Sequence, residues 1–303
     1  MQVGLRQRAK RIQGGAWTSQ RLKRLPAILT KLRRFSKMNL SQVQDIAGCR
    51  AVLGTVPRVR RLVAAYKESG AEHVLHHEKD YVTTPQVSGY RGVHLIYRFR
   101  SIPRAEFNNL FVEVQIRSLL QHVWATAVET VDFFQRQTLK TGGGEQSWRR
   151  FFALASAAFA RIERSPLVPE TPEQSSAAYA ELVYLEEELD VLRRLASYRQ
   201  AFGEILAPSA SRARIFLLRM VPRSGSDKLQ LRVRGYRAAE AERAEADYYR
   251  YEQSIRGIRG ADVVLVEVRS LAELRQAYPN YFVNTQFFER ELRRLLRPRR
   301  KRG

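Results

Sequence analysis

Residues 112–117 read Val-Glu-Val-Gln-Ile-Arg, and their strict alternation of apolar and polar side chains decides the fold class. Successive side chains of a β-strand point to opposite faces, so a period of two predicts a strand with one buried face. The apolar positions 112, 114 and 116 are expected on that buried face. Glu113, Gln115 and Arg117 are then expected to project together from the other.

The chain before and after this strand predicts a mixed α/β core. Asp45 precedes an apolar run that ends at Leu53 and is typical of a strand. Apolar positions 59–66 and 123–131 follow helical spacing, and turn formers at 85–92 predict a loop before a β-type run at 93–99. A basic amphipathic helix is expected around residues 25–33.

Beyond residue 139 two further regions are expected. The linker at 140–144 lacks the spacing of a phosphate-binding loop. Leu182, Leu185, Leu189 and Leu192 then predict one helix packed on another. Paired strands at 215–220 and 229–233, a helix at 238–255, a strand at 263–268 and helices up to residue 296 follow. The predicted fold class is α+β, with a core at 1-139, a helical extension at 140-207 and a small α+β domain with a basic tail at 208-303.

The composition favours a globular protein that attracts polyanions. The chain has 303 residues, 44% of them hydrophobic, and a formal net charge of +23. Such charge suits nucleoside triphosphates, RNA or a ribosome, and does not choose among them. No apolar run reaches the roughly 18 residues of a membrane span, and a single cysteine excludes an internal disulfide framework. We therefore expect a cytoplasmic protein without a membrane partner.

Two carboxylates, Asp45 and Glu113, are the candidate metal ligands. Mg²⁺ is usually held by one or two carboxylates together with phosphate oxygens and water. Read alone, an Asp before a strand is a turn former and a Glu on a strand faces solvent. The spacing by itself leaves both interpretations open.

Five motifs resemble the RelA/SpoT-type synthetase domain and occur in the order of that family. The resemblance covers roughly residues 5–135. The motifs are Arg21-Leu22-Lys23 with Lys31, Asp45-Ile46-Ala47-Gly48-Cys49-Arg50, Asp80-Tyr81 with Ser88-Gly89-Tyr90-Arg91-Gly92-Val93-His94, Val112-Glu113-Val114-Gln115-Ile116-Arg117, and Gln121-His122-Val123-Trp124-Ala125 ending at Glu129.

The resemblance implies a nucleotidyltransferase-like core with a mixed sheet and a GTP diphosphokinase activity. In this reaction the β,γ-pyrophosphate of ATP moves to the 3′-hydroxyl of GDP or GTP, which makes the alarmone (p)ppGpp of the stringent response, with Mg²⁺ as cofactor. The His-Asp pair of the family's hydrolase domain is not found in the sequence. We therefore expect synthesis without hydrolysis.

The resemblance also implies roles for individual residues. Asp45 and Glu113 would bind Mg²⁺, and Glu113 would also orient or deprotonate the acceptor hydroxyl. The remaining residues would contact the nucleotides: Lys23 and Lys31 the ATP phosphates, Arg21 and Arg50 the adenine, Tyr90 the acceptor guanine, and His94 and Gln115 the acceptor phosphates or ribose.

Two alternatives remain open from the sequence. Some relatives are toxins that pyrophosphorylate adenine nucleotides or the 3′ end of tRNA, and the basic surface suits tRNA. A basic protein that binds RNA or the ribosome without catalysis is the other. The sequence also leaves open the oligomeric state, a restraining antitoxin or other partner, the role of the C-terminal region and the completeness of the N-terminus.

Overall fold

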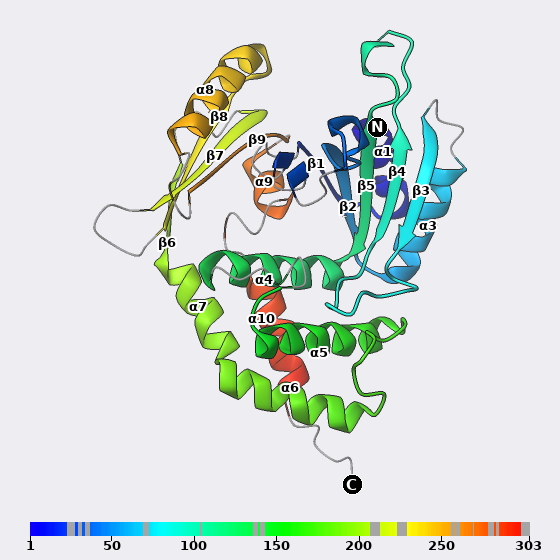
Figure 1. Cartoon of the computed structure of the whole chain (residues 1–303), viewed down its shortest axis with the longest axis vertical. Coiled ribbons are helices and arrows are strands. Elements are labelled where there is room, and N and C mark those ends of the chain that lie inside the picture. Colours follow the sequence, from blue (N-terminus) through cyan, green and yellow to red (C-terminus); the bar gives the residue numbers. More distant parts are fainter. Residues whose placement is uncertain are drawn as a thin grey trace. The chain divides into compact units, whose positions relative to one another are not determined.

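The computed structural model of the chain describes residues 1–22, 28–29, 32–33, 37–68, 73–103, 105–135, 139, 143–206, 213–222, 229–255, 258, 261–268, 270–277, 282 and 285–297. It contains two compact units, and each is assembled from several stretches of chain (Figure 1). The first unit comprises Met1–Asp80, Gly92–Ser118 and Gly203–Tyr278. The second comprises Tyr81–Arg91, Leu119–Phe202 and Pro279–Gly303. The three sequence ranges proposed above as domains stay a prediction.

A five-stranded mixed sheet forms the centre of the first unit. Its spatial order is β1-β2-β5-β4-β3. Strands β2 and β5 are parallel, whereas the other neighbouring pairs are antiparallel. The mixed sheet confirms the predicted α+β class. The strands are β1 (Trp17–Leu22), β2 (Ala47–Leu53), β3 (Val74–Asp80), β4 (Val93–Arg98) and β5 (Phe111–Ser118).

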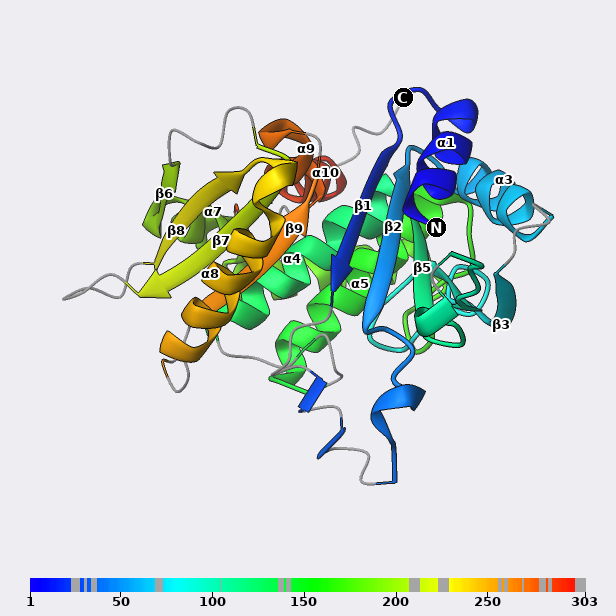
Figure 2. The ribbon, with the colours of Figure 1, turned by 90° about the horizontal axis from the view of Figure 1, so that it is seen from above.

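Two helices pack against this sheet. The helices α1 (Gln2–Ile12) and α3 (Val56–Lys67) contact each other and strand β2 (Figure 2). Their apolar stripes are buried, with Leu5 on α1 and Leu62 on α3 both fully inaccessible to solvent. The helix α3 confirms the spacing at residues 59–66, whereas α1 and β1 carry weaker patterns that the sequence analysis did not identify. Two short 3₁₀ turns, at Leu40–Gln42 and Ala105–Phe107, complete this part of the unit.

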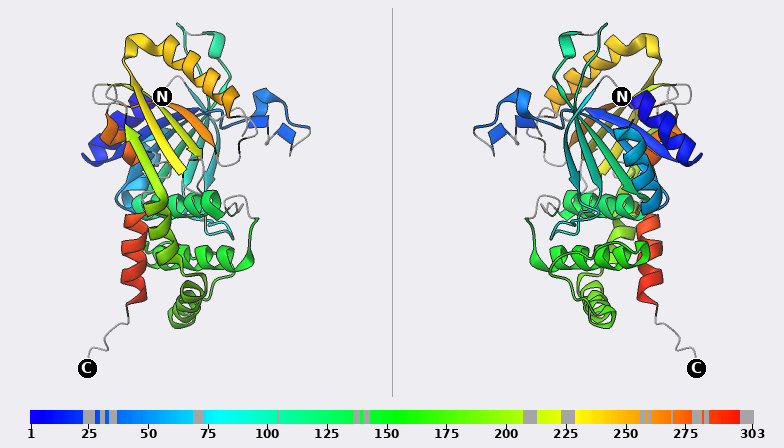
Figure 3. Two further views of the ribbon diagram at one scale, coloured as in Figure 1. Left: turned by 90° about the vertical axis from the view of Figure 1, so that its left-hand side faces the viewer. Right: turned by 90° about the vertical axis from the view of Figure 1, so that its right-hand side faces the viewer.

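A second sheet belongs to the same unit and has the order β6-β8-β7-β9. Its strands are β6 (Phe202–Leu206), β7 (Ile215–Pro222), β8 (Leu229–Tyr236) and β9 (Asp262–Glu267). Helix α8 (Ala241–Ser254) packs on β7 and β9, as Figure 3 shows in gold beside the yellow strands, and α9 (Leu271–Ala277) follows β9. The antiparallel pairing of β7 with β8 confirms the predicted hairpin, whose turn at 224–227 lies outside the described residues.

The second unit is helical around an aromatic core. Its helices are α4 (Leu119–Gln135), α5 (Gln146–Glu163), α6 (Ser175–Leu189), α7 (Val191–Ala201) and α10 (Gln286–Leu296). Trp148, Phe152 and Phe288 are almost completely buried in one cluster, where the rings of Trp148 and Phe152 stack. Aromatic side chains bury much apolar area per residue, so this cluster contributes strongly to holding α5 against α4 and α10.

The leucine pattern at 182–192 spans two helices instead of the single helix predicted. Asp190 adopts a left-handed conformation with φ of 50° and ends α6, after which α7 begins at Val191. Leu182, Leu185 and Leu189 are buried as expected, and Leu192 lies on the next helix. A left-handed residue interrupts helical hydrogen bonding without changing the apolar spacing, so the periodicity alone did not reveal the break. None of the helices in the described ranges is both long and apolar enough to cross a membrane.

Candidate functional site

Four of the residues expected to contact the nucleotides, Arg21, Arg50, His94 and Gln115, fall in two neighbouring rows across the mixed sheet. In the first row, strand pairing places Ser19, Arg50, Gln115, His94 and Lys79 side by side on β1, β2, β5, β4 and β3. Residues paired across strands project from the same face of a sheet. The parallel pairing of β2 with β5 therefore brings together residues that are more than sixty positions apart in the sequence.

The second row carries the catalytic candidate. It aligns Arg21, Gly48 and Glu113 on β1, β2 and β5. A Cβ atom at Gly48 would lie 3.3 Å from the carbonyl oxygen of Glu113. This spacing is tighter than ordinary van der Waals contact, so a glycine lets the two strands pair closely at this position.

The carboxylate of Glu113 contacts two neighbouring side chains and lies at the end of a row of polar contacts. His94 Nδ1 lies 2.7 Å from Glu113 Oε1, and both side chains are 13% exposed. Gln115 Nε2 donates to Glu113 Oε2 at 2.6 Å, and Arg117 donates to Gln115 Oε1 at 3.2 Å. Because Arg117 occupies the amide oxygen of Gln115, the amide nitrogen is directed at the carboxylate. These contacts thus fix the orientation of the Glu113 carboxylate.

Asp45 and Glu113 line one small pocket. Asp45 lies in the turn before β2, and Glu113 lies on the neighbouring strand β5. The rest of the pocket wall is formed by Ser19, Gln20, Gly48, Cys49, Arg50 and Gln115. Asp45 lies just before β2, and β5 pairs with β2 in parallel. This pairing brings two carboxylates that are distant in the sequence to the same cavity.

The pocket has the chemistry of a site for a divalent cation and phosphates. Two carboxylates supply the oxygen ligands that Mg²⁺ prefers, and Arg50 supplies a planar cation suited to phosphate or to an aromatic base. Within the described part of the chain, no three His, Cys, Asp or Glu side chains cluster as they would in a site built of protein ligands alone. The donors present therefore fit a cation held jointly by protein and substrate.

Tyr90 belongs to the second unit, where a loop between β3 and β4 lies against the helices. Its ring is half-buried, packs on the aromatic core and meets the ring of Tyr81 edge-on at 5.6 Å between centroids. Gly89 has φ of 90°, and a Cβ atom there would lie 2.9 Å from Trp124. Only glycine adopts this conformation readily and leaves room for the indole.

Several predicted contacts fall outside the described residues. Lys23 and Lys31, expected at the ATP phosphates, lie there together with most of the basic helix at 25–33. Arg21 lies on β1, but its side chain is outside the description. Of the basic tail, Arg293 and Arg294 form ion pairs with Glu289 and Glu291 on α10. These two arginines are therefore partly engaged within their own helix.

Three residues near the pocket received no role in the sequence analysis. Arg117 was expected with Glu113 on an open polar face, but it is 3% exposed and orients Gln115. Its position two residues after Gln115 on the same face is the signal that could have indicated this role. Ser19 and Gln20 line the pocket from β1, and that strand carries no alternation strong enough to predict it.

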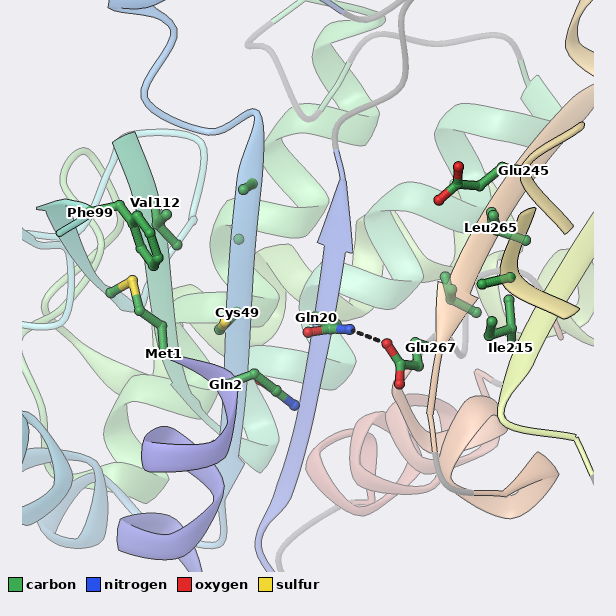
Figure 4. A pocket seen from close by; sticks show the side chains of 14 residues that line it. Met1, Gln2, Gln20, Cys49, Phe99, Val112, Ile215, Glu245, Leu265 and Glu267 are labelled. Carbon is green, nitrogen blue, oxygen red and sulfur yellow. Dashed lines mark hydrogen bonds between the residues drawn. The ribbon is translucent and has the colours of Figure 1, made fainter. Parts of the chain in front are cut away.

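A larger cavity adjoins the pocket within the same unit. It has a volume of about 450 Å³ and shares Gln20, Gly48 and Cys49 with the pocket. Figure 4 shows Gln20 directed at Glu267 of β9, to which its amide donates a hydrogen bond of 3.3 Å. Burial raises the pKa of the Cys49 thiol to about 11, so this cysteine is poorly suited to act as a nucleophile.

Comparison with known proteins identifies the region that carries this pocket. A family described as "Region found in RelA / SpoT proteins" matches residues 20–134. An uncharacterized protein of Mycobacterium tuberculosis is 35% identical over 130 residues, which cover 39% of this chain and 42% of that protein. The GTP pyrophosphokinase YjbM of Bacillus subtilis is 29% identical over 115 residues, which cover 37% of this chain and 54% of YjbM. The chain thus spans about half the length of these relatives.

Solved structures give partial matches. One is small alarmone synthetase 1 from Bacillus subtilis, bound to its product pppGpp. The match covers 49% of this chain and 74% of the synthetase chain, with 26% identity and a TM-score of 0.42. A GTP pyrophosphokinase family protein from Streptococcus pneumoniae matches 54% of this chain and 82% of its own, with 21% identity and a TM-score of 0.46. From the sequence match and the motifs it contains, residues 20–134 of this chain are a RelA/SpoT-type region.

Proposed function

We propose that this chain is a pyrophosphokinase that transfers the β,γ-pyrophosphate of ATP to the 3′-hydroxyl of GDP or GTP. The products would be AMP and the alarmone (p)ppGpp. The RelA/SpoT region at residues 20–134 and the GTP pyrophosphokinases among its relatives support this reaction class. One of the partly matching solved structures is bound to its product pppGpp, which is a guanine nucleotide.

The observation that carries the proposal is the shared pocket of Asp45 and Glu113. Phosphoryl-transfer sites work mainly by positioning and by electrostatic stabilisation, for which they need carboxylates for the cation and cations for the phosphates. Asp45, Glu113 and Arg50 meet this need in one pocket, and they lie inside the RelA/SpoT region. A protein that only bound RNA would gain nothing from two carboxylates in a groove meant for phosphates.

In the proposed reaction the acceptor 3′-oxygen attacks the β-phosphorus of ATP. A new bond forms between that oxygen and phosphorus, while the bond from the β-phosphorus to the oxygen bridging to the α-phosphate breaks and AMP leaves. Glu113 would accept the hydroxyl proton, and the contacts of its carboxylate with His94 and Gln115 support this role. The attacking oxygen is thereby aligned at low entropic cost.

Asp45 and Glu113 would hold a Mg²⁺ ion in this reaction. When bound, the ion would neutralise the charge of the phosphates and lower the pKa of the acceptor hydroxyl. Arg50 and Arg21 would stack on the adenine, Lys23 and Lys31 would hold the ATP phosphates, and Tyr90 would stack on the acceptor base. Guanidinium planes and aromatic rings both suit the flat faces of nucleobases.

The test is a label-transfer assay with γ-labelled ATP and Mg²⁺. GDP, GTP, AMP and tRNA are offered separately to the full chain. We expect label in a guanine product that also carries the β-phosphate of ATP. Label only in tRNA or in an adenine nucleotide would overturn the acceptor, and no transfer to any of them would overturn the reaction.

A further inference from the structure

The loop that carries Tyr90 is fastened to α5 on both sides of the tyrosine. Before it, Ser156 Oγ donates a hydrogen bond of 2.6 Å to the carbonyl oxygen of Gly89. After it, Arg91 forms an ion pair with Glu163 at 2.8 Å. The residues on either side of Tyr90 are thus held by the same helix.

The two attachments are joined to each other. Ser156 Oγ, which donates to Gly89, also accepts a hydrogen bond from Arg91 Nε at 3.2 Å. Arg91 further donates to Ser165 Oγ at 3.0 Å. We call Arg91, Ser156, Glu163 and Ser165 the loop anchor. Its side chains form one connected network, so the loop cannot leave α5 without breaking several bonds together.

The anchor is sealed from water. The side chains of Arg91 and Glu163 are 1% and 6% exposed, and Ser156 is 1% exposed. Burial lowers the pKa of the Arg91 guanidinium, and Glu163 opposes this effect. A buried ion pair with its hydrogen bonds in place fixes geometry more strongly than an exposed one, since water does not replace either partner.

The negative charge of Glu163 is compensated by a residue of the loop. Glu163 is the last residue of α5, where the helix dipole disfavours a negative charge. Arg91, with a weaker contribution from Gln121 on α4 at 3.4 Å, offsets this cost. An acid at a helix C-terminus is thus explained by its contact with the loop.

The loop is also internally closed, so the anchor acts on a preformed turn. Gly89 N donates to the carbonyl oxygen of Gln86 at 2.8 Å, and Gln86 N donates to that of Tyr90 at 3.2 Å. The close approach of Gly89 to Trp124 leaves the turn no room to sink further toward the helices. Tyr90 remains half-exposed at the end of this rigid turn.

We infer that Ser156 and Glu163 are positioning residues for the acceptor nucleotide, because through Arg91 and Gly89 they hold Tyr90 ready to stack on the base. Both residues lie on α5, outside the RelA/SpoT region at 20–134. The helical segment would therefore supply part of acceptor recognition. This inference rests on the proposed function for the role of Tyr90, but the anchor itself is a feature of the fold.

The test combines kinetics with hydrogen exchange on the full chain. Glu163→Gln removes the charge and keeps a hydrogen-bonding group, while Ser156→Ala is a milder change if the first variant folds poorly. Glu181→Gln is the matched control, since it breaks the ion pair between Arg150 on α5 and Glu181 on α6 without touching the loop. Label transfer is measured with GDP varied at saturating ATP and then with ATP varied at saturating GDP.

We expect Glu163→Gln and Ser156→Ala to raise the KM for GDP about tenfold and to leave the KM for ATP unchanged. Amides of residues 86–91 should exchange faster in both variants, and the control should alter neither quantity. Faster exchange with an unchanged KM for GDP would overturn the positioning role. An unchanged KM in Tyr90→Ala would instead show that the acceptor role proposed for the tyrosine is wrong.

Discussion

Two glutamates, one in each unit, are similarly buried but lie in different surroundings. Glu113 contacts His94 and accepts a hydrogen bond from Gln115, keeps 13% of its side chain exposed and lines a pocket. Glu163 accepts bonds from Arg91 and Gln121, is 6% exposed and belongs to the loop anchor. Each contacts at least two oriented partners, and Glu113 in addition lines a cavity.

The difference lies in the charge of the partners. Glu163 faces a guanidinium that is permanently charged and equally buried, so removing either partner leaves an uncompensated charge inside the protein. Glu113 contacts an imidazole and an amide at the wall of a pocket, where a bound cation could reach its carboxylate. A mutation at Glu163 should therefore act mainly on folding and loop geometry, and a mutation at Glu113 mainly on chemistry.

The largest expected effect is on stability, at the buried pair. Glu163→Leu should lower the free energy of unfolding of the second unit by about 3–5 kcal/mol, because it strands the Arg91 charge. The measurement is urea unfolding by fluorescence in a Trp17→Phe background, where Trp124 and Trp148 both report on the second unit. Arg91→Met combined with Glu163→Leu should recover most of the loss. A double variant no more stable than the single one would contradict this explanation.

The second effect is on turnover, at the pocket. Glu113→Gln and Asp45→Asn should each reduce label transfer by at least about 10²-fold, the scale of losing a key electrostatic group. Thermal unfolding should change little, since both side chains are partly exposed at the wall of a pocket. Glu106→Gln, an exposed acid of the same unit, serves as control. Turnover close to that of the wild type in either pocket variant would refute the site.

A smaller effect is expected at Tyr90, on the binding of the acceptor nucleotide. Tyr90→Ala should weaken acceptor binding by about 1–3 kcal/mol, the range for stacking of one base. The quantity to measure is the KM for GDP, with the KM for ATP as internal reference. Tyr184→Ala removes an exposed tyrosine of α6 and controls for loss of an aromatic ring. A change confined to the KM for ATP would contradict the assignment.

The smallest effect is expected at a partly exposed ion pair on the same helix as Glu163. Arg150 contacts Glu181 at 2.5 Å, with side chains 31% and 35% exposed, so Glu181→Gln should cost only about 0.2–1 kcal/mol. The hydrogen bond from Arg150 lowers the pKa of Glu181. Its contribution is therefore present above the ordinary carboxyl pKa and is lost as the pH falls through the folded value. Unfolding of both proteins at neutral and at acid pH should show the difference disappearing in acid.

Local pattern predicted most of the secondary structure. The alternation at 112–117 became β5, the spacing at 59–66 became α3, and the runs at 215–220 and 229–233 became paired strands. Strand β1 and helix α1 were not identified, and neither was strand β6, which lies within the range expected to be a helical extension. At 182–192 a left-handed Asp190 divides the expected helix, and conformation at a single residue leaves no trace in apolar periodicity.

The candidate site was predictable in its residues but less so in its partnerships. Asp45 and Glu113 line one pocket, and Arg50, Gln115 and His94 fall in one row of the sheet, while the roles expected for these residues stay predictions. The role of Arg117 in orienting Gln115 was missed. The alternation in a strand predicts which face of the sheet a side chain projects from, but not its hydrogen-bond partner. The anchor was missed as well, since Arg91 and Glu163 are 72 positions apart.

From the order of residues alone follow the α+β class, the motifs of the RelA/SpoT region and the two carboxylates that carry the proposed chemistry. These depend on side-chain periodicity and residue type, which are local properties. The parallel pairing of β2 with β5 and the contact of α5 with the Tyr90 loop depend instead on which buried surfaces fit together. Such fits are settled by packing and by the pairing of buried charges, and these act between segments that the sequence keeps far apart.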